Sequence, residues 1–144
     1  MQKICLGNCK SNQITFSAAN SVITYDKLLY SSQSGLQGDS PGIDINTGKF
    51  VSGFSGTYRV DFSLYSAPDP VDVTSMYLYK NGENIQETKF MAARSSTGSG
   101  PDQNTGGRSV LLHLDLGDEV FLVTGTTDTA YRIIFCVSLE QIDV

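Results

Sequence analysis

The sequence is poor in the residues on which several classes of site depend. Its 144 residues include no tryptophan, one histidine and three cysteines, and only 17% of them are charged. One histidine without a cluster of cysteines argues against a transition-metal site, which needs several nitrogen or sulfur ligands. The ten Lys and Arg residues are scattered singly, and fifteen Asp and Glu residues outnumber them. The chain therefore lacks the basic stripe of a nucleic-acid-binding protein, and no nucleic-acid partner is expected.

Long apolar runs and helical periodicity are also missing. No apolar run approaches the roughly 20 residues that a membrane-spanning helix needs, so membrane insertion is not expected. Residues 1–10 lack the apolar core of a secretory signal. No segment repeats apolar residues with a period of about 3.6, which predicts almost no helix. The sequence does contain 40% hydrophobic residues and 14 glycines, a composition typical of an all-β protein with frequent turns.

The clearest single element is a long alternating stretch that begins at residue 58. Its apolar positions are Tyr58, Val60, Phe62 and Leu64, and polar residues occupy the positions between them. A period of two is typical of a strand with one buried face. Gly56 precedes this stretch and allows positive φ or a close backbone approach, which predicts a corner between two strands.

Further segments of β-type composition follow one another with turn residues between them. We expect strands at residues 14–18, 22–25, 27–30, 42–46, 71–80, 83–91, 108–116, 119–124 and 131–142. Asn81-Gly82 joins two of them and is the strongest short signal for a hairpin. About eight to ten strands with long connections favour a jelly-roll β-sandwich over an immunoglobulin sandwich. Residues 14–144 are therefore predicted to form one domain, preceded by a tail, residues 1–13, that carries Cys5 and Cys9.

The three cysteines give different expectations. Cys136 lies in an apolar strand, and because free cysteine is among the most buried residue types, we expect a buried free thiol there. Cys5 and Cys9 lack the second pair of ligands that a zinc site needs. The alternatives for these two are free thiols, a bond to each other, or a link between chains, which requires an oxidising compartment.

Several short motifs, in order along the chain, match those of one known family. They are Phe16-Ser17-Ala18, Gly48 with Phe50, Gly56 with Tyr58, Asn81-Gly82, and Leu112, Leu114, Gly117, Asp118 and Val120. With these motifs the sequence resembles the globular head domain of complement C1q, which shares its fold with tumour necrosis factor. The family closes on a Phe-Ser-Gly-like strand, whereas this chain has Phe135-Cys136-Val137, so the packing there is expected to differ.

The resemblance implies a jelly roll of about ten strands that assembles as a homotrimer, is secreted, and recognises other molecules without catalysis. The sequence has no nucleophile elbow and no phosphate-binding loop, which agrees with a non-enzymatic role. We predict a secreted, extracellular domain that binds protein or carbohydrate ligands through multivalent, lectin-like contacts in innate immunity. The alternative is a structural trimerisation module of a larger extracellular protein.

The strands also carry apolar or aromatic residues on the face that does not form the core. A monomeric sandwich is expected to have polar outer faces, so we assign these residues to the trimer interface. They are Tyr65, Tyr77, Tyr79, Leu111, Phe121 and Ile134. His113 lies on the outward side of its strand, either as an interface residue that senses pH or as an ordinary solvated histidine.

The candidate ligand residues lie in or beside the loops. Arg94 and Arg108 flank the long loop 92–107, and Tyr131 and Arg132 follow a threonine-rich turn. Aromatic and arginine side chains together suit carbohydrate or anionic ligands. The alternative for each of these residues is an ordinary surface position.

The same long loop contains the one candidate for a metal ligand set. Asp102, Gln103 and Asn104 offer the oxygen atoms that calcium prefers. Three copies of this stretch around an axis would build a calcium site that one chain lacks. The alternative is a polar loop without a cofactor.

Overall fold

The computed structural model describes residues 3–7, 14–15, 21–31, 43–44, 47–66, 73–93, 104–124 and 129–143. Within these ranges there is no helix, and so none that is long and apolar enough to cross a membrane. The described strands are β1 Lys3–Gly7, β2 Ile14–Thr15, β3 Lys27–Ser31, β4 Ile43–Asp44, β5 Lys49–Val51, β6 Gly56–Ser66, β7 Val73–Lys80, β8 Glu83–Ala93, β9 Asn104–Leu114, β10 Glu119–Thr124 and β11 Thr129–Ile142. The prediction of an all-β chain is confirmed.

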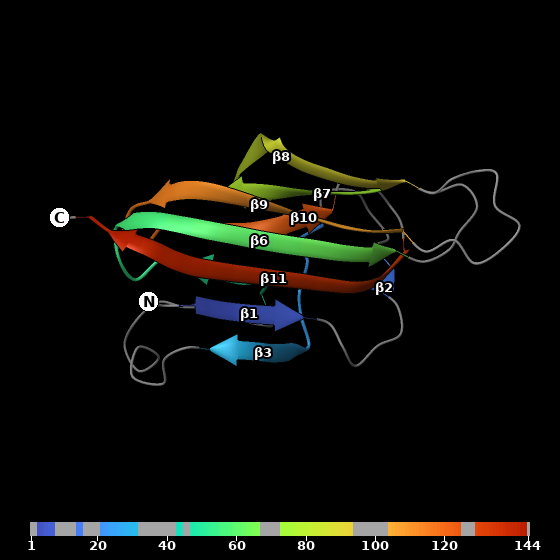
Figure 1. Ribbon diagram of the computed structural model, residues 1–144, viewed down its shortest axis with the longest axis horizontal. Coiled ribbons are helices and arrows are strands. Elements are labelled where there is room, and N and C mark those ends of the chain that lie inside the picture. Colours follow the sequence, from blue (N-terminus) through green and yellow to red (C-terminus); the bar gives the residue numbers. More distant parts are fainter. Residues whose placement is uncertain are drawn as a thin grey trace, which may run out of the picture.

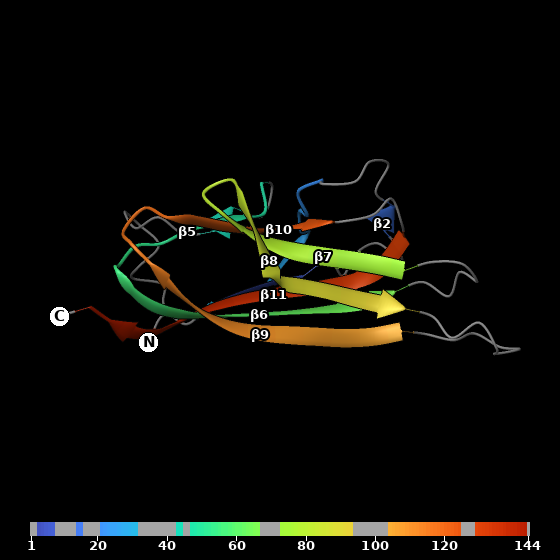
Figure 2. The ribbon, with the colours of Figure 1, turned by 90° about the horizontal axis from the view of Figure 1, so that it is seen from above.

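The strands form two antiparallel sheets that pack face to face (Figure 1). The first sheet has the order β3-β1-β11-β6-β9, with β2 also paired to β11. The second sheet has the order β4-β5-β10-β7-β8. Figure 2 shows the two layers from above, with β6, β9 and β11 in one layer and β5 and β10 in the other. Each sheet therefore has one face in the core and one outer face.

The core forms between the sheets because strands from both layers alternate apolar and polar residues. Tyr58, Val60 and Phe62 of β6 are buried, as predicted, and Arg59 between them is exposed. The ring of Tyr58 meets Phe50 of the second sheet edge-on, with ring centroids 5.7 Å apart. Its hydroxyl donates a hydrogen bond of 2.7 Å to the carbonyl of Phe54, so this polar atom is satisfied in the core.

Two predicted corners are present. Gly56 begins β6 where this strand crosses close to β11, and a Cβ there would lie 2.1 Å from the carbonyl oxygen of Gln141. Glycine is required by this close approach of two backbones. Asn81 and Gly82 both have positive φ, 51° and 83°, which is the conformation of a two-residue hairpin turn between β7 and β8.

The start of the chain differs from the expected tail. Residues 3–7 form β1, which lies inside the first sheet between β3 and β11. Leu6 of β1 is fully buried in the core, and Ile4 packs against it. The sequence signal was weak because a five-residue strand shows only two apolar alternations, which is too few to distinguish from an irregular segment.

The prediction of a free thiol at Cys136 is wrong. Cys136 forms a disulfide bond with Cys5, which lies directly opposite it in the β1–β11 pairing. In β11 the residues on either side, Phe135 and Val137, point into the core, so Cys136 points to the outer face, where Cys5 is its neighbour. Cys9, the third cysteine, lies outside the described residues.

Candidate functional site

The outer face of the first sheet is the most distinctive surface of the described part of the molecule. Strand registers place its outward residues in rows that cross β1, β11, β6 and β9. One row is Gly7, Ile134, Ser63 and Gly107, and the next is Cys5, Cys136, Asp61 and Ser109. A third row is Lys3, Ser138, Arg59 and Leu111. These twelve outward positions, together with His113 one row further on, are called the A face.

Small residues create a depression in the A face. It has a volume of about 380 Å³ and is lined by Asp61, Phe62, Ser63, Gly107, Arg108, Ser109, Ile134 and Cys136. The floor of the depression is low because Ser63, Gly107 and Ser109 have small side chains or none. A larger residue at Gly107 is disfavoured, since its Cβ would lie only 2.9 Å from the carbonyl oxygen of Phe62. The depression is shallow and open, so it suits the side chains of a protein surface better than an enclosed small molecule.

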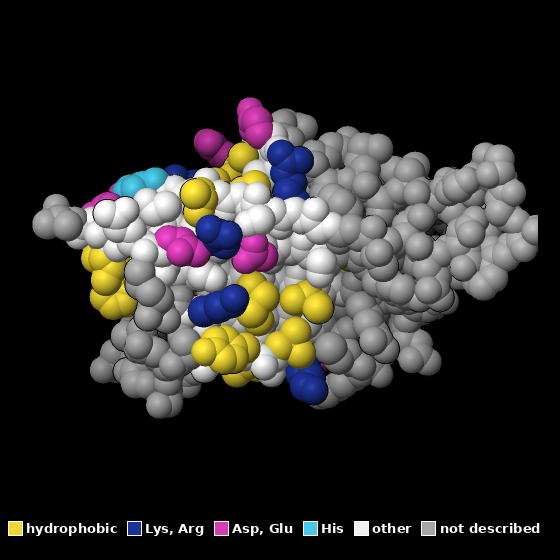
Figure 3. Space-filling model, viewed as in Figure 1, with side chains coloured by type: hydrophobic (Ala, Val, Ile, Leu, Met, Phe, Trp, Pro, Cys, Tyr) yellow, Lys and Arg dark blue, Asp and Glu magenta, His cyan; other side chains and the backbone are white. Residues whose placement is uncertain are grey.

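The exposed apolar side chains are distributed unequally between the two sheets. Among the strand residues whose side chains are described, every large exposed hydrophobic residue belongs to the first sheet. The residues are Leu28, Leu29 and Tyr30 of β3, Leu111 of β9, and Ile134 and Ile142 of β11. Leu111 is 60% exposed and Ile134 is 39% exposed, both on the A face. Figure 3 shows hydrophobic side chains gathered on this side of the molecule.

Charged groups accompany the apolar residues of the A face. Arg59 donates a hydrogen bond of 3.0 Å from Nε to Oε1 of Glu140, and both side chains are about half exposed. An exposed pair of this kind contributes little to stability, with a typical value of about 0–1 kcal/mol. Its role is therefore to set the charge pattern of the surface rather than to hold the fold together.

The outer face of the second sheet is built differently. The rings of Tyr79 and Phe121 lie 5.5 Å apart, and Nζ of Lys49 lies 4.9 Å from the centre of the Phe121 ring. Lys49 also forms an ion pair of 3.6 Å with Glu119. Phe121 is only 5% exposed. The Phe121 ring of this cluster is therefore already covered by Lys49 of its own chain.

The structure thus divides the residues that the sequence assigned to one interface. Leu111, His113 and Ile134 lie on the A face, whereas Tyr77, Tyr79 and Phe121 lie on the opposite side of the sandwich. The alternation of residues along a strand shows which side chains leave the core, but it does not show to which sheet the strand belongs. The structure describes only the backbone of Tyr65, in β6.

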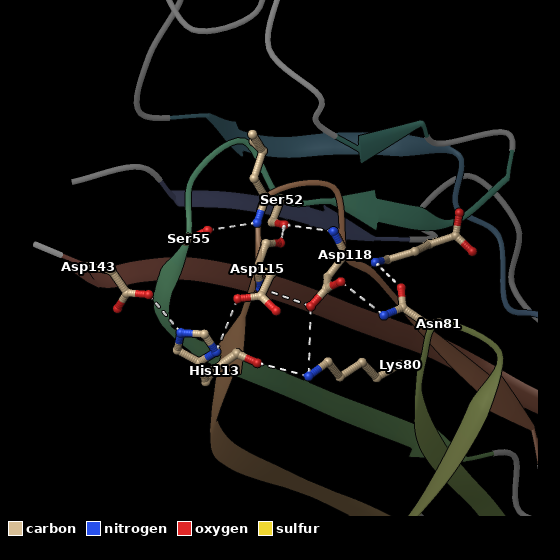
Figure 4. A network of polar contacts seen from close by, with 10 residues as sticks. Ser52, Ser55, Lys80, Asn81, His113, Asp115, Asp118 and Asp143 are labelled. Atoms are coloured by element: carbon tan, nitrogen blue, oxygen red, sulfur yellow. Dashed lines mark hydrogen bonds and ion pairs between the residues drawn. The ribbon is translucent and has the colours of Figure 1, made fainter.

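A polar network lies at the end of the sandwich where the C-terminus emerges (Figure 4). Asp118 is its centre in the turn between β9 and β10. Oδ1 of Asp118 accepts a hydrogen bond of 3.0 Å from Nδ2 of Asn81, and Oδ2 accepts one of 2.8 Å from the backbone of Asp115. These hydrogen bonds lower the pKa of Asp118. The Ser52 hydroxyl bonds the carbonyl of Asp115, which joins the β5–β6 turn to the same network.

His113 lies at the edge of this network, on the A face. Its Nε2 is 2.8 Å from Oδ2 of Asp143, and its Nδ1 is 3.8 Å from Oδ1 of Asp115. The hydrogen bond with Asp143 raises the pKa of His113 above its ordinary value. Nζ of Lys80 donates a hydrogen bond of 3.1 Å to the backbone carbonyl of His113. The single histidine therefore lies between two carboxylates from different parts of the chain.

The predicted ligand residues are only partly described. Arg108 lies at the depression of the A face, opposite Phe62 in the β6–β9 pairing. Arg94 lies outside the described residues, and the structure describes only the backbone of Tyr131 and Arg132, in β11. The depression residues Asp61, Ser63, Gly107 and Cys136 were not predicted. Their signal was the run of small outward residues, which is visible only once the strands are paired.

Most of the predicted calcium ligands also lie outside the described residues. Asp102 and Gln103 lie outside the described residues, and Asn104 begins β9, where its backbone pairs with Ser66. Among the described side chains, no group of three or more His, Cys, Asp and Glu residues could hold a metal ion. Calcium binding by the loop stays a prediction.

Comparisons with known proteins agree with this architecture. A family model described as the C1q domain matches residues 9–135. A comparison with curated protein sequences finds no match. Among solved structures, the globular domain of zebrafish complement 1qA protein has 16% identity and a TM-score of 0.69, and the match covers 99% of this chain and 100% of that one. Eiger TNF from S. frugiperda has 18% identity and a TM-score of 0.64, with coverage of 99% and 94%. These likenesses confirm the jelly-roll fold.

Proposed function

Because this chain belongs to the C1q domain family, we propose that it is a secreted, non-enzymatic recognition domain that works as a homotrimer. The observation that carries the proposal is the location of the large exposed hydrophobic residues, which all lie in the first sheet among the strand residues with described side chains. An outer sheet face in water is expected to be polar, and a gathered apolar patch marks an interaction surface. The A face is therefore the proposed surface of assembly.

The geometry of a closed ring favours assembly through one outer sheet face rather than through both opposite faces. Two contact patches that face in opposite directions stack copies into an open filament, whereas a threefold ring needs patches that are inclined to each other. Leu111, His113 and Ile134 are therefore kept as interface residues. Tyr77, Tyr79 and Phe121 are placed outside this interface, on a surface that stays free for other contacts.

The disulfide bond supports the proposed extracellular location. Structural disulfides form and persist in oxidising compartments and are rare in the reducing cytosol. The bond between Cys5 and Cys136 joins the first strand to the last one, so the fold as described includes an oxidised pair. We propose secretion on this ground together with the family membership.

Recognition would then depend on multivalency. Three weak sites on one rigid trimer raise the apparent affinity for a surface that repeats its ligand. Arg94, Arg108, Tyr131 and Arg132 remain the proposed contacts to protein or carbohydrate ligands, in a lectin-like role in innate immunity. The loop residues Asp102, Gln103 and Asn104 remain the proposed calcium site.

Light scattering in solution tests the assembly. The chain has a mass of 15.6 kDa, and we expect the native protein to show three times that mass. Leu111→Asp places a charge in the proposed interface and should give a monomer. Asn84→Asp, a change at an exposed position of the second sheet, is the matched control and should leave the trimer intact. A monomeric native protein would contradict the proposal.

A binding array separates the two functions that a trimer allows. We expect the native oligomer to bind members of a panel of glycans and extracellular proteins, and to bind them more weakly when Leu111→Asp has made it monomeric. A trimer that binds nothing on the panel would favour the structural trimerisation module. That alternative is supported by the same concentration of apolar residues on one face.

A further inference from the structure

We infer that His113 makes assembly through the A face sensitive to pH, so that the trimer is tighter at mildly acidic pH than at mildly alkaline pH. The inference rests on the proposed trimer and concerns its regulation. His113 is the only histidine of the chain, and its side chain is 53% exposed. It is therefore the side chain whose ordinary pKa lies closest to neutral pH, and it is accessible to protons in the free subunit.

The position of His113 connects its charge to the A face. His113 and Leu111 lie two residues apart on β9, so both side chains point outward and are separated by about 7 Å along the strand. Leu111 is the most exposed hydrophobic residue of this face. A partner that covers Leu111 therefore approaches His113 as well and removes water from its surroundings.

The groups around His113 make its protonation state important. Asp143, beyond the end of β11, lies 2.8 Å from Nε2, and Asp115, in the turn after β9, lies 3.8 Å from Nδ1. Lys80 of β7 is the cation that acts on His113, and its Nζ is shared between the His113 carbonyl, at 3.1 Å, and Oδ2 of Asp118, at 3.8 Å. Arg59 of the A face and Glu140 of β11 form an ion pair and neutralise each other.

These charges determine the direction in which pH changes the strength of assembly. When His113 is protonated, it offsets one of its two neighbouring carboxylates, and when it is neutral, both negative charges are uncompensated. Each subunit is already negative, with a net charge of -5, so assembly brings like charges together. The hydrogen bond with Asp143 raises the pKa of His113 in the folded subunit, so its positive charge is present at mildly acidic pH and is lost as the pH rises through the folded pKa.

The alternative is a local clamp that only fixes the chain end. The backbone N–H of Asp143 donates a hydrogen bond of 2.9 Å to the carbonyl of Ser55, so the C-terminal residues are held in place without the imidazole as well. A clamp of this kind would change the thermal stability of an isolated subunit with pH. It would leave the association of folded subunits unchanged.

The test is a dilution series of the full chain, followed by sedimentation velocity at pH 8, 7 and 6. We expect the concentration at half-assembly to fall as the pH is lowered. Each pKa unit that His113 gains on assembly corresponds to a factor of about ten per histidine in the assembly constant. His113→Gln should show no such dependence, and Asp143→Asn should show a weaker one. His113→Asn provides a second neutral variant if the first one fails to fold.

Three outcomes distinguish the possibilities. A trimer whose half-assembly concentration is the same at all three pH values, or one whose pH dependence survives His113→Gln, overturns the inference and leaves the proposed trimer intact. A pH effect that is confined to the melting temperature of the Leu111→Asp monomer also overturns it, in favour of the local clamp. A native chain that stays monomeric at every pH and concentration overturns the proposed function itself.

Discussion

At the scale of single residues, the side on which a strand residue lies decides its role. Phe135 and Cys136 are neighbours in β11, yet Phe135 is fully buried in the core and Cys136 lies on the A face in a disulfide. The alternation of Ile133, Phe135 and Val137 in the sequence already placed Cys136 on the opposite side. The sequence did not show the partner, because Cys5 reaches Cys136 only through the pairing of β1 with β11.

Phe135 provides a measure of what the core contributes. Its ring stacks on Tyr25 at a centroid distance of 5.9 Å, and it has no exposed surface. We expect Phe135→Ala to lower the free energy of unfolding by about 3–5 kcal/mol, because it removes buried apolar surface and leaves a cavity. Urea denaturation at fixed protein concentration measures this change. The exposed control Asn84→Ala should stay within about 0.5 kcal/mol of the native chain; a similar loss in both variants would contradict the assignment of Phe135 to the core.

At the scale of elements, the long strands and the short strands β2, β3 and β4 could be predicted, whereas β1 could not. The alternation around Phe62 and the Asn81-Gly82 turn correspond to β6 and to the β7–β8 hairpin. These signals are local, because burial of one strand face and the left-handed turn conformation each depend on adjacent residues. β1 has little signal of its own. It is a strand because β3 and β11 pair with it on both sides, and pairing between distant segments leaves no trace in a five-residue window.

The disulfide is expected to hold this edge of the first sheet. β3 is hydrogen-bonded only to β1 among the described strands, and the bond between Cys5 and Cys136 fastens β1 to β11 across a sequence separation of 131 residues. A link over so long a loop restricts the unfolded chain strongly. We expect the double change Cys5→Ser and Cys136→Ser to lower the free energy of unfolding by about 2–5 kcal/mol.

Two measurements check this expectation. Thermal melting should show a lower midpoint for the double variant, and hydrogen exchange should accelerate first at residues 3–7 and 27–31. A dithiol reductant is the matched control, because it should lower the melting temperature of the native chain and leave the double variant unchanged. A reductant that acts equally on both proteins would show that the loss does not come from this bond.

At the scale of the whole molecule, the two outer faces have different roles. The sequence identified outward aromatic and apolar residues on several strands but could not sort them by sheet. The structure places Leu111 and Ile134 on one side and Tyr79 and Phe121 on the other. The difference between the faces lies in what covers them: Lys49, paired with Glu119, lies over Phe121, whereas no described side chain forms a comparable cover over Leu111.

This contrast leads to a prediction about unwanted assembly. Lys49→Leu removes the charge above Phe121 and the ion pair with Glu119, and it adds an apolar side chain to the aromatic cluster of the second outer face while the A face remains available. Two apolar faces on opposite sides of one subunit allow contacts that do not close into a ring. We expect species larger than the native trimer that grow with protein concentration, as measured by sedimentation velocity.

Two further variants make the result specific. Lys49→Gln removes the charge but keeps the surface polar, so it should assemble like the native chain. Adding Leu111→Asp to Lys49→Leu should suppress the large species, because open growth needs both faces. If Lys49→Leu forms the same trimer as the native protein at every concentration, the charged cover over Phe121 does not limit assembly, and the second outer face is unsuited to self-association for another reason.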